Sequence, residues 1–441
     1  MIKKIIKIVL IIFLILTLII FYLSIFGIKT DKFNNQITNS ILKINKKINL
    51  SLSDVSYLLN PYDFTINIKT KNPKILLEGR SFGIKTIQTN IALKSLINDQ
   101  FLIDDLQIIT KEIKLSNIIT LARVFKNSQQ LFILGTFIKD GIVTASMNFN
   151  FDDKGEIKKN YKIKGTVKKV KLNILNQFKL QDLNFNFNIS KNIYSLKKLD
   201  TKFNGIKLIV PQIEIKKNKN SFFVDGQLLT KKKNFDIKEL KSIFVNFLNE
   251  VDIQKIEFSS KNNFSFNINK NLKFDSLKIE SVVDLEQLIV KKKDFQLKQY
   301  LPSFVKEIKL EKHNIIINYN KKKFDIKGNG NFLLEDKSDE ISYHIIKNKN
   351  DLSFDSKMNL KNNSLLINFL DYEKKEGLNS LVSIKGNFKK NNQLSFDLIN
   401  IKEKNNGIVI KGLELSKSFK ILDITNLNIN YRNNNNILNN L

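Results

Sequence analysis

Cysteine and tryptophan are absent from this 441-residue sequence, and only 4 prolines and 15 glycines occur in it. The absence of cysteine excludes disulfides, thiolate metal sites and thiol catalysis. The scarcity of proline and glycine leaves no stretch that resembles a flexible linker between domains. We therefore expect one continuous architecture rather than a series of domains joined by linkers.

Arginine is also rare, although the formal net charge is +31: Arg80, Arg123 and Arg432 are the only arginines, so nearly all the cations are lysines. Lysine is the weaker residue for bidentate recognition of phosphates and bases. The 34 phenylalanines fall mainly on alternating positions instead of being interleaved with arginine on an exposed platform. We expect no nucleic-acid partner, and we interpret lysine runs such as Lys231 to Lys233 as solvated turns that protect sheet edges from aggregation.

Catalytic and metal-binding signatures are missing as well. His313 and His344 are the only histidines, and both are expected to be exposed strand residues rather than ligands. The acidic pairs Asp104-Asp105 and Asp152-Asp153 lack the alternating oxygen ligands of a calcium loop. No His-Glu-x-x-His, Gly-x-Ser-x-Gly or Walker sequence occurs. We expect no enzyme, no catalytic residue, no metal and no cofactor.

The most informative feature present is an apolar N-terminal stretch, Ile8 to Ile28, which contains no charged residue. Crossing a bilayer takes about 20 apolar residues, whereas the apolar region of a cleaved signal peptide has about 7–15. Lys3, Lys4 and Lys7 precede the stretch, and cationic flanks stay in the cytoplasm. No Ala-x-Ala cleavage site follows it. Residues 1–29 are thus expected to be a cytoplasmic stub and an uncleaved single-pass anchor, with the bulk of the chain on the far side.

After the anchor the apolar period changes from helical to strand-like. Apolar residues at spacings of three and four predict an amphipathic connecting helix over residues 30–50. From residue 51 onward the period is two, which indicates antiparallel strands with one apolar and one polar face. The clearest alternating apolar sets are Phe64, Ile66 and Ile68, then Phe185, Phe187 and Ile189, then Ile206, Leu208 and Val210, and then Phe264, Phe266 and Ile268.

Turn and helix signals interrupt these strands. Asp140-Gly141, Asp153-Lys154-Gly155 and Asp225-Gly226 predict tight turns between short strands. Two helical interruptions are expected near 236–249 and 297–306, the first with a capping pattern followed by an apolar stripe. The strand pattern ends in an incomplete pair near residue 431, so we expect the natural reading frame to continue past Leu441.

Several stretches together resemble a known family. They are Val55 to Pro61, Phe64 to Lys69, Asn72 to Leu76, Ile91 to Leu96, Ile103 to Ile108, the short helical stretch Ser116 to Phe125, and Gln299 to Val305. In this order they resemble the N-terminal portion of AsmA-like proteins of Gram-negative bacteria, which include the YhdP- and TamB-type bridge-like lipid transport proteins. The shared patterns of apolar spacing cover most of the chain. The sequence departs from the family in lacking its usual tryptophan.

The resemblance implies a mainly β fold: a long curved antiparallel sheet forming a trough (β-taco-like), with a few short helices and one N-terminal transmembrane helix. It implies an N-terminal AsmA-like, chorein-like trough over 51–230 that continues over 231–441. The concave apolar face would carry phospholipid acyl chains between the inner and outer membranes. Lipid-groove candidates are then Phe64, Ile66, Ile68, Phe185, Phe187, Ile189, Phe264, Phe266 and Ile268. The structural alternative is a pair of closed β-sandwich domains whose phenylalanines form cores.

A second function fits the same composition. The protein is then a scaffold or assembly factor that pairs its exposed strand edges with outer-membrane or other periplasmic proteins and carries no lipid. Strand addition needs an edge and does not need an apolar trough. The feature that separates the two hypotheses is therefore the continuity of the apolar rows across successive strands.

Overall fold

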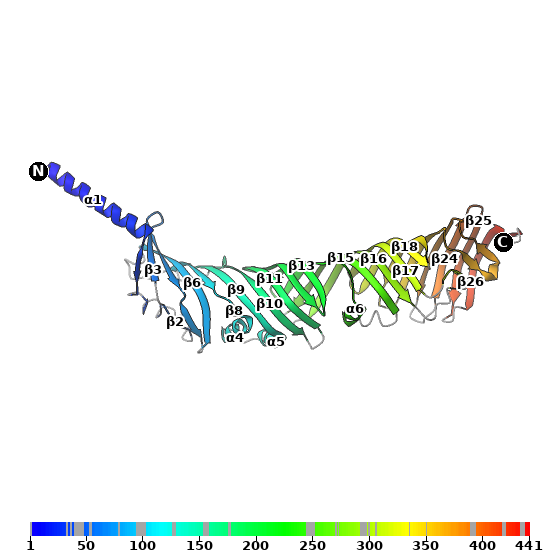
Figure 1. Ribbon diagram of the computed structural model, residues 1–441, viewed down its shortest axis with the longest axis horizontal. Coiled ribbons are helices and arrows are strands. Elements are labelled where there is room, and N and C mark those ends of the chain that lie inside the picture. The colour runs from blue at the N-terminus through cyan, green and yellow to red at the C-terminus, as the bar shows by residue number, and fades with distance from the viewer. Residues whose placement is uncertain are drawn as a thin grey trace. The chain divides into compact units, whose positions relative to one another are not determined.

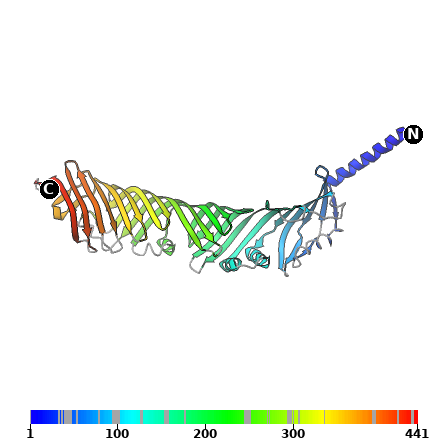
Figure 2. The same ribbon diagram turned by 180° about the vertical axis from the view of Figure 1, so that it is seen from behind.

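The protein is a mainly β structure with few helices (Figures 1 and 2). The computed structural model describes residues 2–31, 34–35, 38, 48–52, 55–77, 80–93, 103–125, 129–152, 158–174, 178–243, 252–269, 271, 273–291, 298, 300–304, 307–334, 336–349, 351–388, 394–416, 420–432 and 437–441. The chain forms two compact units, which we call unit 1 (Met1–Phe203 with Glu214–Asn218) and unit 2 (Asn204–Ile213 with Lys219–Leu441).

The elements of unit 1 begin with a long helix. The helices are α1 (Ile2–Ile25), α4 (Leu115–Phe125) and α5 (Gln129–Phe137). The strands are β1 (Ile28–Thr30), β2 (Ile48–Ser51), β3 (Val55–Asn60), β4 (Thr65–Lys71), β5 (Lys74–Leu77), β6 (Arg80–Ala92), β7 (Ile103–Thr110), β8 (Ile113–Lys114), β9 (Ile138–Asn150), β10 (Lys162–Ile174), β11 (Phe178–Ser190) and β12 (Ile193–Phe203). Strand β13 (Ile206–Lys217) contributes to both units.

Unit 2 is a longer series of strands. They are β14 (Ser221–Asn234), β15 (Asp252–Asn269), β16 (Phe274–Lys291), β17 (Glu307–Asn320), β18 (Lys323–Leu334), β19 (Lys337–Lys347), β20 (Leu352–Leu360), β21 (Leu365–Ile367), β22 (Tyr372–Lys374), β23 (Ser380–Phe388), β24 (Leu394–Glu403), β25 (Asn406–Leu415), β26 (Ile421–Arg432) and β27 (Leu438–Asn440). Its helices are α6 (Ile237–Ile243) and the short 3₁₀ helix η2 (Asn368–Leu370).

Strand pairing is antiparallel throughout the described residues of each unit. In unit 1 the ladder order is β1, β3, β4, β6, β7, β9, β10, β11 and β12; β5 pairs with the start of β6, and β2 pairs with β5. In unit 2 it is β14 to β20 and then β23 to β27, with β21 and β22 as a separate hairpin inserted after β20. The prediction of a mainly β, antiparallel fold with a few helices is confirmed.

The longer insertions of unit 2 all lie at one edge of its strands. Helix α6 follows β14, residues 300–304 precede β17, and the β21–β22 hairpin follows β20. In a meander the chain reverses at every connection, so every second connection returns to the same edge. The insertions therefore gather at the same end of the strands, and we call this end of the sheet the insertion edge.

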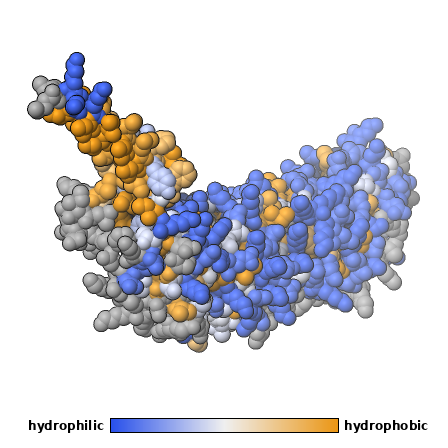
Figure 3. All heavy atoms as spheres, turned by 60° about the vertical axis from the view of Figure 1, so that its left-hand side comes forward, coloured by the Kyte–Doolittle hydropathy of each residue, from blue (hydrophilic) through white to orange (hydrophobic). Residues whose placement is uncertain are grey.

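Helix α1 is long and apolar enough to cross a membrane, and its apolar window over Lys3–Ile25 is not buried against the rest of the protein. Figure 3 shows it as a hydrophobic rod with a hydrophilic tip beside a largely hydrophilic outer surface. The predicted span ran on to Ile28, but the helix ends at Ile25 because Gly27 has φ +62° and Ile28 already pairs with Tyr57 of β3. The last apolar residues thus belong to the sheet.

The helix predictions have mixed outcomes. The stretch from Ser116 to Phe125 is confirmed as α4, whereas α5 was not predicted. The predicted helix near 236–249 is confirmed over Ile237–Ile243, and the rest of it lies outside the described residues. Near 297–306, Lys298 is 3₁₀-helical, but residues 300–304 form a turn in which Phe304 N donates to Leu301 O (2.9 Å), so the predicted helix does not extend over them. Most of 30–50 is not described, but Asn34, Asn35 and Thr38 are helical, in agreement with the predicted connecting helix, whereas its end belongs to strand β2.

Three turn predictions are wrong. Lys231 to Lys233 are the exposed last part of β14 and not a turn. Asp140-Gly141 lies inside β9, where Gly141 (φ +144°) meets an irregularity in the β9–β10 register between Lys168 and Lys171. Asp225-Gly226 lies inside β14, directly opposite Ser265 and Phe264 of β15. Glycine within a strand marks a bulge or a close approach as readily as a turn, so the dipeptide alone was misleading. The remaining predicted turn, 153–155, lies outside the described residues.

Candidate functional site

Alternating side chains of unit 2 form one continuous apolar face. The strand register places the following residues opposite one another from β17 to β26: Ile317, Ile326, Ile345, Phe354, Gly386, Phe396, Leu413 and Ile424. A residue two positions along each strand points to the same side. We call this set and its same-side neighbours the apolar face of unit 2; the row itself contains no polar residue across eight strands of the described ladder.

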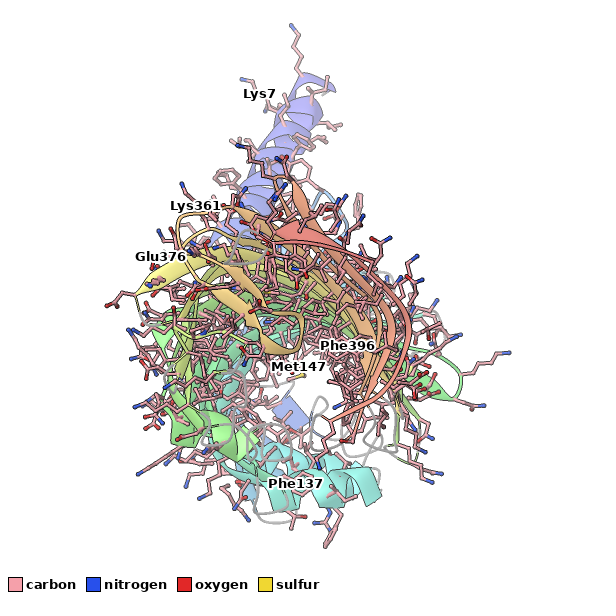
Figure 4. All side chains as sticks on the ribbon, turned by 90° about the vertical axis from the view of Figure 1, so that its right-hand side faces the viewer. Lys7, Phe137, Met147, Lys361, Glu376 and Phe396 are labelled. Atoms are coloured by element: carbon pink, nitrogen blue, oxygen red, sulfur yellow. The ribbon has the colours of Figure 1, made fainter. Side chains whose placement is uncertain are left out.

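Unit 1 has a corresponding face. Its register row from β4 to β12 is Thr70, Ile87, Ile108, Met147, Ile163, Ile189 and Tyr194. In Figure 4, Met147 of unit 1 and Phe396 of unit 2 each point to the hollow side of their own strands, whereas Lys361 and Glu376 point away from it. The apolar faces of the two units are thus on the hollow sides of their sheets.

The first three lipid-groove candidates, Phe64, Ile66 and Ile68, differ in their positions in the fold. Ile66 is partly buried, and Ile68 (7% exposed) packs with Val55 and Ile91. Phe64, however, is 71% exposed and lies in the turn before β4 with φ +50°, so its expected place in the alternating strand is wrong. The turn signal of Asn60 and Pro61 ends the strand pattern before Phe64, and β4 begins at Thr65.

The β11 candidates lie on the apolar face of unit 1, as the alternation predicted. The register places Phe185 opposite Val167, Phe187 opposite Gly165 and Ile189 opposite Ile163. All three are partly buried, while Asn186 and Asn188 between them are less enclosed and lie on the other side of the strand. The structure therefore brings Phe185, Phe187 and Ile189 onto the same face as Ile66 and Ile68.

The β15 candidates lie on the apolar face of unit 2 and form an aromatic group. Phe266 is partly buried; its ring centroid is 6.1 Å from that of Phe264 and 5.5 Å from that of Phe274, which is 72% exposed. Ile268 is partly buried and pairs with Phe222 and Phe274. Such incomplete burial of large apolar side chains is what an open hydrocarbon-binding surface requires, and a closed core would bury them fully.

Glycine lies beneath an aromatic ring at five points of these faces, a feature that the sequence pattern does not reveal. A Cβ on Gly165 would come within 2.6 Å of Phe187 Cζ, one on Gly226 within 2.7 Å of Phe264 Cζ, and one on Gly386 within 2.9 Å of Phe354 Cζ. Gly328 lies under Tyr343 in the same way, and Gly330 under His313. The rings therefore lie flat across the neighbouring strand and leave the hollow side open. These pairs of glycine and ring can be recognised only when the strand register is known.

His313 was expected to be exposed, and this is wrong: it is 2% exposed and lies on the apolar face of unit 2. His313 shares the side of Ile315 and Ile317 and lies over Gly330, next to a bulge in β17 at which Lys312 has φ +51°. Its Nε2 lies 2.9 Å from Asn331 O, and its Nδ1 lies 3.3 Å from the Tyr343 hydroxyl. Because a carbonyl only accepts, Nε2 carries the proton and Nδ1 accepts from Tyr343. The second histidine, His344, lies partly exposed beside Asp325.

Burial lowers the pKa of His313, against a smaller opposing effect of its bond to Asn331 O. The unfolded chain then binds a proton more readily than the folded one, so the free energy of unfolding falls as the pH drops below the ordinary histidine pKa of about 6.5. We expect a His313→Phe variant to lose this part of the acid destabilisation, because the ring still fits over Gly330 without titrating. Urea unfolding of both proteins between neutral and mildly acidic pH measures it, and equal pH slopes would contradict it.

A network of buried polar groups lies at the insertion edge of unit 2, next to the apolar face. Asp339, 4% exposed, accepts from the backbone N–H groups of Lys361, Asn362 and Asn363, each at 2.9 Å. The ammonium of Lys374, which is fully buried, donates to Asn363 O (2.6 Å) and Lys361 O (3.0 Å), and burial lowers its pKa. These bonds fix the segment that carries the β21–β22 hairpin.

The same segment is anchored in the core. The Tyr372 hydroxyl donates to Glu403 (2.8 Å), and burial raises the pKa of Tyr372 well above its usual range. Its ring meets Tyr431 edge-on at 5.2 Å, and Leu366 N donates to Tyr300 O (2.8 Å), which joins the hairpin to the turn at 300–304. The core of unit 2 therefore lies mainly at the insertion edge, and it also includes Leu413 and Leu415 near the opposite end of β25.

The chemistry of the described residues is that of apolar contact. Among them no group of three or more His, Cys, Asp or Glu side chains is placed to hold a metal ion. Nearly all the described ion pairs are on the surface, as between Lys232 and Glu286 (2.7 Å) and between Lys337 and Glu376 (2.6 Å). Comparison of the chain with protein-family models, with curated proteins and with solved structures found no match.

Proposed function

We propose that this protein is held in the inner membrane by α1 and binds phospholipid acyl chains along its apolar faces, carrying phospholipid between the inner and outer membranes. The observation that supports this most is the continuity of apolar side chains across successive strands within each unit. Scaffolding by strand addition needs an open edge and gives no reason for such a face.

The energetics favour an acyl chain as occupant. Apolar surface left in water costs about 25 cal/mol per Å² relative to burial, so a row of partly exposed Phe, Ile and Leu is unfavourable when bare. A hydrocarbon chain buries that surface without needing a polar partner. The described strands present mostly apolar atoms there, with few hydrogen-bonding groups to fix one orientation, so the face suits sliding contact with chains of varied structure.

Mass spectrometry of lipids that co-purify with the detergent-extracted full-length protein tests this function. We expect phospholipid in at least equimolar amount, and none above background with an unrelated single-pass protein extracted in the same way. Absence of phospholipid after extraction in several mild detergents would refute lipid binding by these faces.

The orientation of α1 yields a separate prediction. Lys3, Lys4 and Lys7 precede the span, and cationic flanks remain in the cytoplasm. A reporter that is active only outside the cytoplasm should therefore work when fused after Asn49. If only a cytoplasmic reporter is active at this position, the periplasmic placement of the apolar faces is wrong.

A further inference from the structure

Two aromatic side chains project from the turn that joins β3 and β4. Tyr62 is 93% exposed and Phe64 is 71% exposed, the highest exposures among the large apolar and aromatic residues described in unit 1. Exposed apolar side chains that stand together beside polar groups often mark an interaction surface. We call residues Asn60 to Phe64 the aromatic turn.

The turn is held in this conformation by its own bonds. Asn60 Oδ1 accepts from the backbone N–H groups of Tyr62 (3.1 Å) and Asp63 (3.4 Å), and Asn60 Nδ2 donates to Asp63 Oδ2 (2.7 Å). Phe64 O accepts from Leu93 N at 2.8 Å. Phe64 has φ +50°, a conformation that is costly for a bulky residue. The structure therefore presents both rings to the outside at a conformational cost.

The turn lies beside the C-terminal end of α1. Ile28, just after the helix, pairs with Tyr57 of β3, and a Cβ on Gly27 would press against Leu58 at 3.1 Å. From Tyr57, β3 continues for three residues to Asn60, about 10 Å at the rise of a strand. Because β1 and β3 are antiparallel, this direction leads toward the end of α1. Figure 1 shows the loop after β3 next to the end of α1. The last turn of α1 and the residue after it carry exposed Tyr22 and Phe26, whose ring centroids lie 5.2 Å apart.

We propose that the aromatic turn inserts Tyr62 and Phe64 into the membrane interface beside the point where α1 leaves the bilayer. Tyr62, with one apolar and one polar end, favours this level of the membrane, and the apolar ring of Phe64 would lose its contact with water there. Asp63, bonded to Asn60, would lie among the headgroups. The turn is then a second membrane contact besides α1. Together they hold one end of the apolar face of unit 1, formed by Leu59, Ile66 and Ile91, at the lipid surface. This inference rests on the proposed anchoring by α1.

The sequence contains no tryptophan, so one substitution gives a unique fluorescent probe. We would reconstitute full-length Phe64→Trp protein in phosphatidylcholine vesicles brominated either near the headgroup or deep in the acyl chains. We expect the emission to fall by about half with the shallow bromines and less with the deep ones, as interfacial indoles behave. Because Phe64 has an unusual φ, Tyr62→Trp, at the most exposed position, is a second probe that requires no packing change.

The matched control is Phe132→Trp. Phe132 is 58% exposed and lies on α5, which directly precedes the start of β9. The other end of β9, at Asn150, pairs with Asp105, which in turn pairs with Asn90 near the aromatic turn. Phe132 therefore lies at the opposite end of the strands from the aromatic turn. The emission of this control should be unaffected by either bromolipid. Equal quenching in all three variants, or no quenching in both Tyr62→Trp and Phe64→Trp, would overturn the inference.

Anchoring and lipid retention measured on the same samples separate this inference from the proposed function. If the Tyr62→Trp and Phe64→Trp variants resist carbonate extraction and retain phospholipid but are not quenched, the membrane contact alone is refuted. Release of the protein by alkaline carbonate would overturn the α1 anchor and this inference with it.

Discussion

A Phe266→Asp variant is expected to accumulate normally and to lose the phospholipid that co-purifies with the native protein. Phe266 lies on the apolar face of unit 2, partly buried and beside Phe264 and Phe274 rather than enclosed in a core. A carboxylate there remains hydrated in the empty protein, so folding is little affected. It must lose that hydration when an acyl chain covers it, which costs several kcal/mol. Protein abundance and bound lipid are measured together.

The first control is Asn267→Asp, on the opposite face of the same strand, which should retain lipid. Its neighbour across the ladder is Asp275, and like charges directly opposite are mildly destabilising. A cleaner pair is available in unit 1, where Phe187→Asp repeats the test. Asn186→Asp is its control, since Asn186 lies on the other face, opposite Thr166 and Lys197.

The outcomes of this series distinguish three possibilities: an open lipid-binding face, a closed core, and lipid binding elsewhere on the protein. Normal abundance with loss of lipid supports an open lipid-binding surface. Loss of folded protein would mean that these phenylalanines form a closed sandwich core, in which an unpaired charge is costly. If the variants are abundant and still carry lipid, the acyl chains bind elsewhere.

An Asp339→Ala variant is expected to lose about 3–5 kcal/mol of unfolding free energy in unit 2, the cost of breaking a buried charged network. The Asp339 carboxylate accepts three backbone N–H bonds and one from Asn363 Nδ2 (3.0 Å) at the start of the segment that carries the β21–β22 hairpin. Its removal leaves these donors without an acceptor in a buried site. It also leaves Lys374, whose charge Asp339 favours, less well compensated.

The loss is measured by urea unfolding, and limited proteolysis should show earlier cleavage within the segment that joins β20 to β23. Asp284→Ala is the matched control, because Asp284 lies on the outer surface and accepts a side-chain bond from Asn314 (3.0 Å). Its effect should stay within about 0.5 kcal/mol, as for an ordinary surface position. Equal stability of the two variants would show that Asp339 does not hold the insertion.

Features that depend on local pattern could be predicted from the amino-acid sequence alone. Twofold alternation identified β11, β13 and β15 and the face on which Phe185, Phe187, Ile189, Phe264 and Phe266 lie, because side chains of a strand must alternate. An uncharged apolar stretch of sufficient length identified α1, since about 20 apolar residues at helical rise match the hydrocarbon thickness of a bilayer. The short helical stretch before residue 126 was identified as α4.

Features that depend on which strand lies beside which required the folded chain. Asp225-Gly226 has the composition of a turn, yet Phe264 of the next strand needs a glycine there. His313 has a polar sequence environment, yet it is buried over Gly330 of the next strand, and Asp339 finds its partners more than twenty residues away. Phe64 continues an alternating pattern, yet the bonds of Asn60 close a turn around it. Cross-strand contacts are long-range properties, and the pattern within one strand does not determine which residue of the neighbouring strand lies opposite.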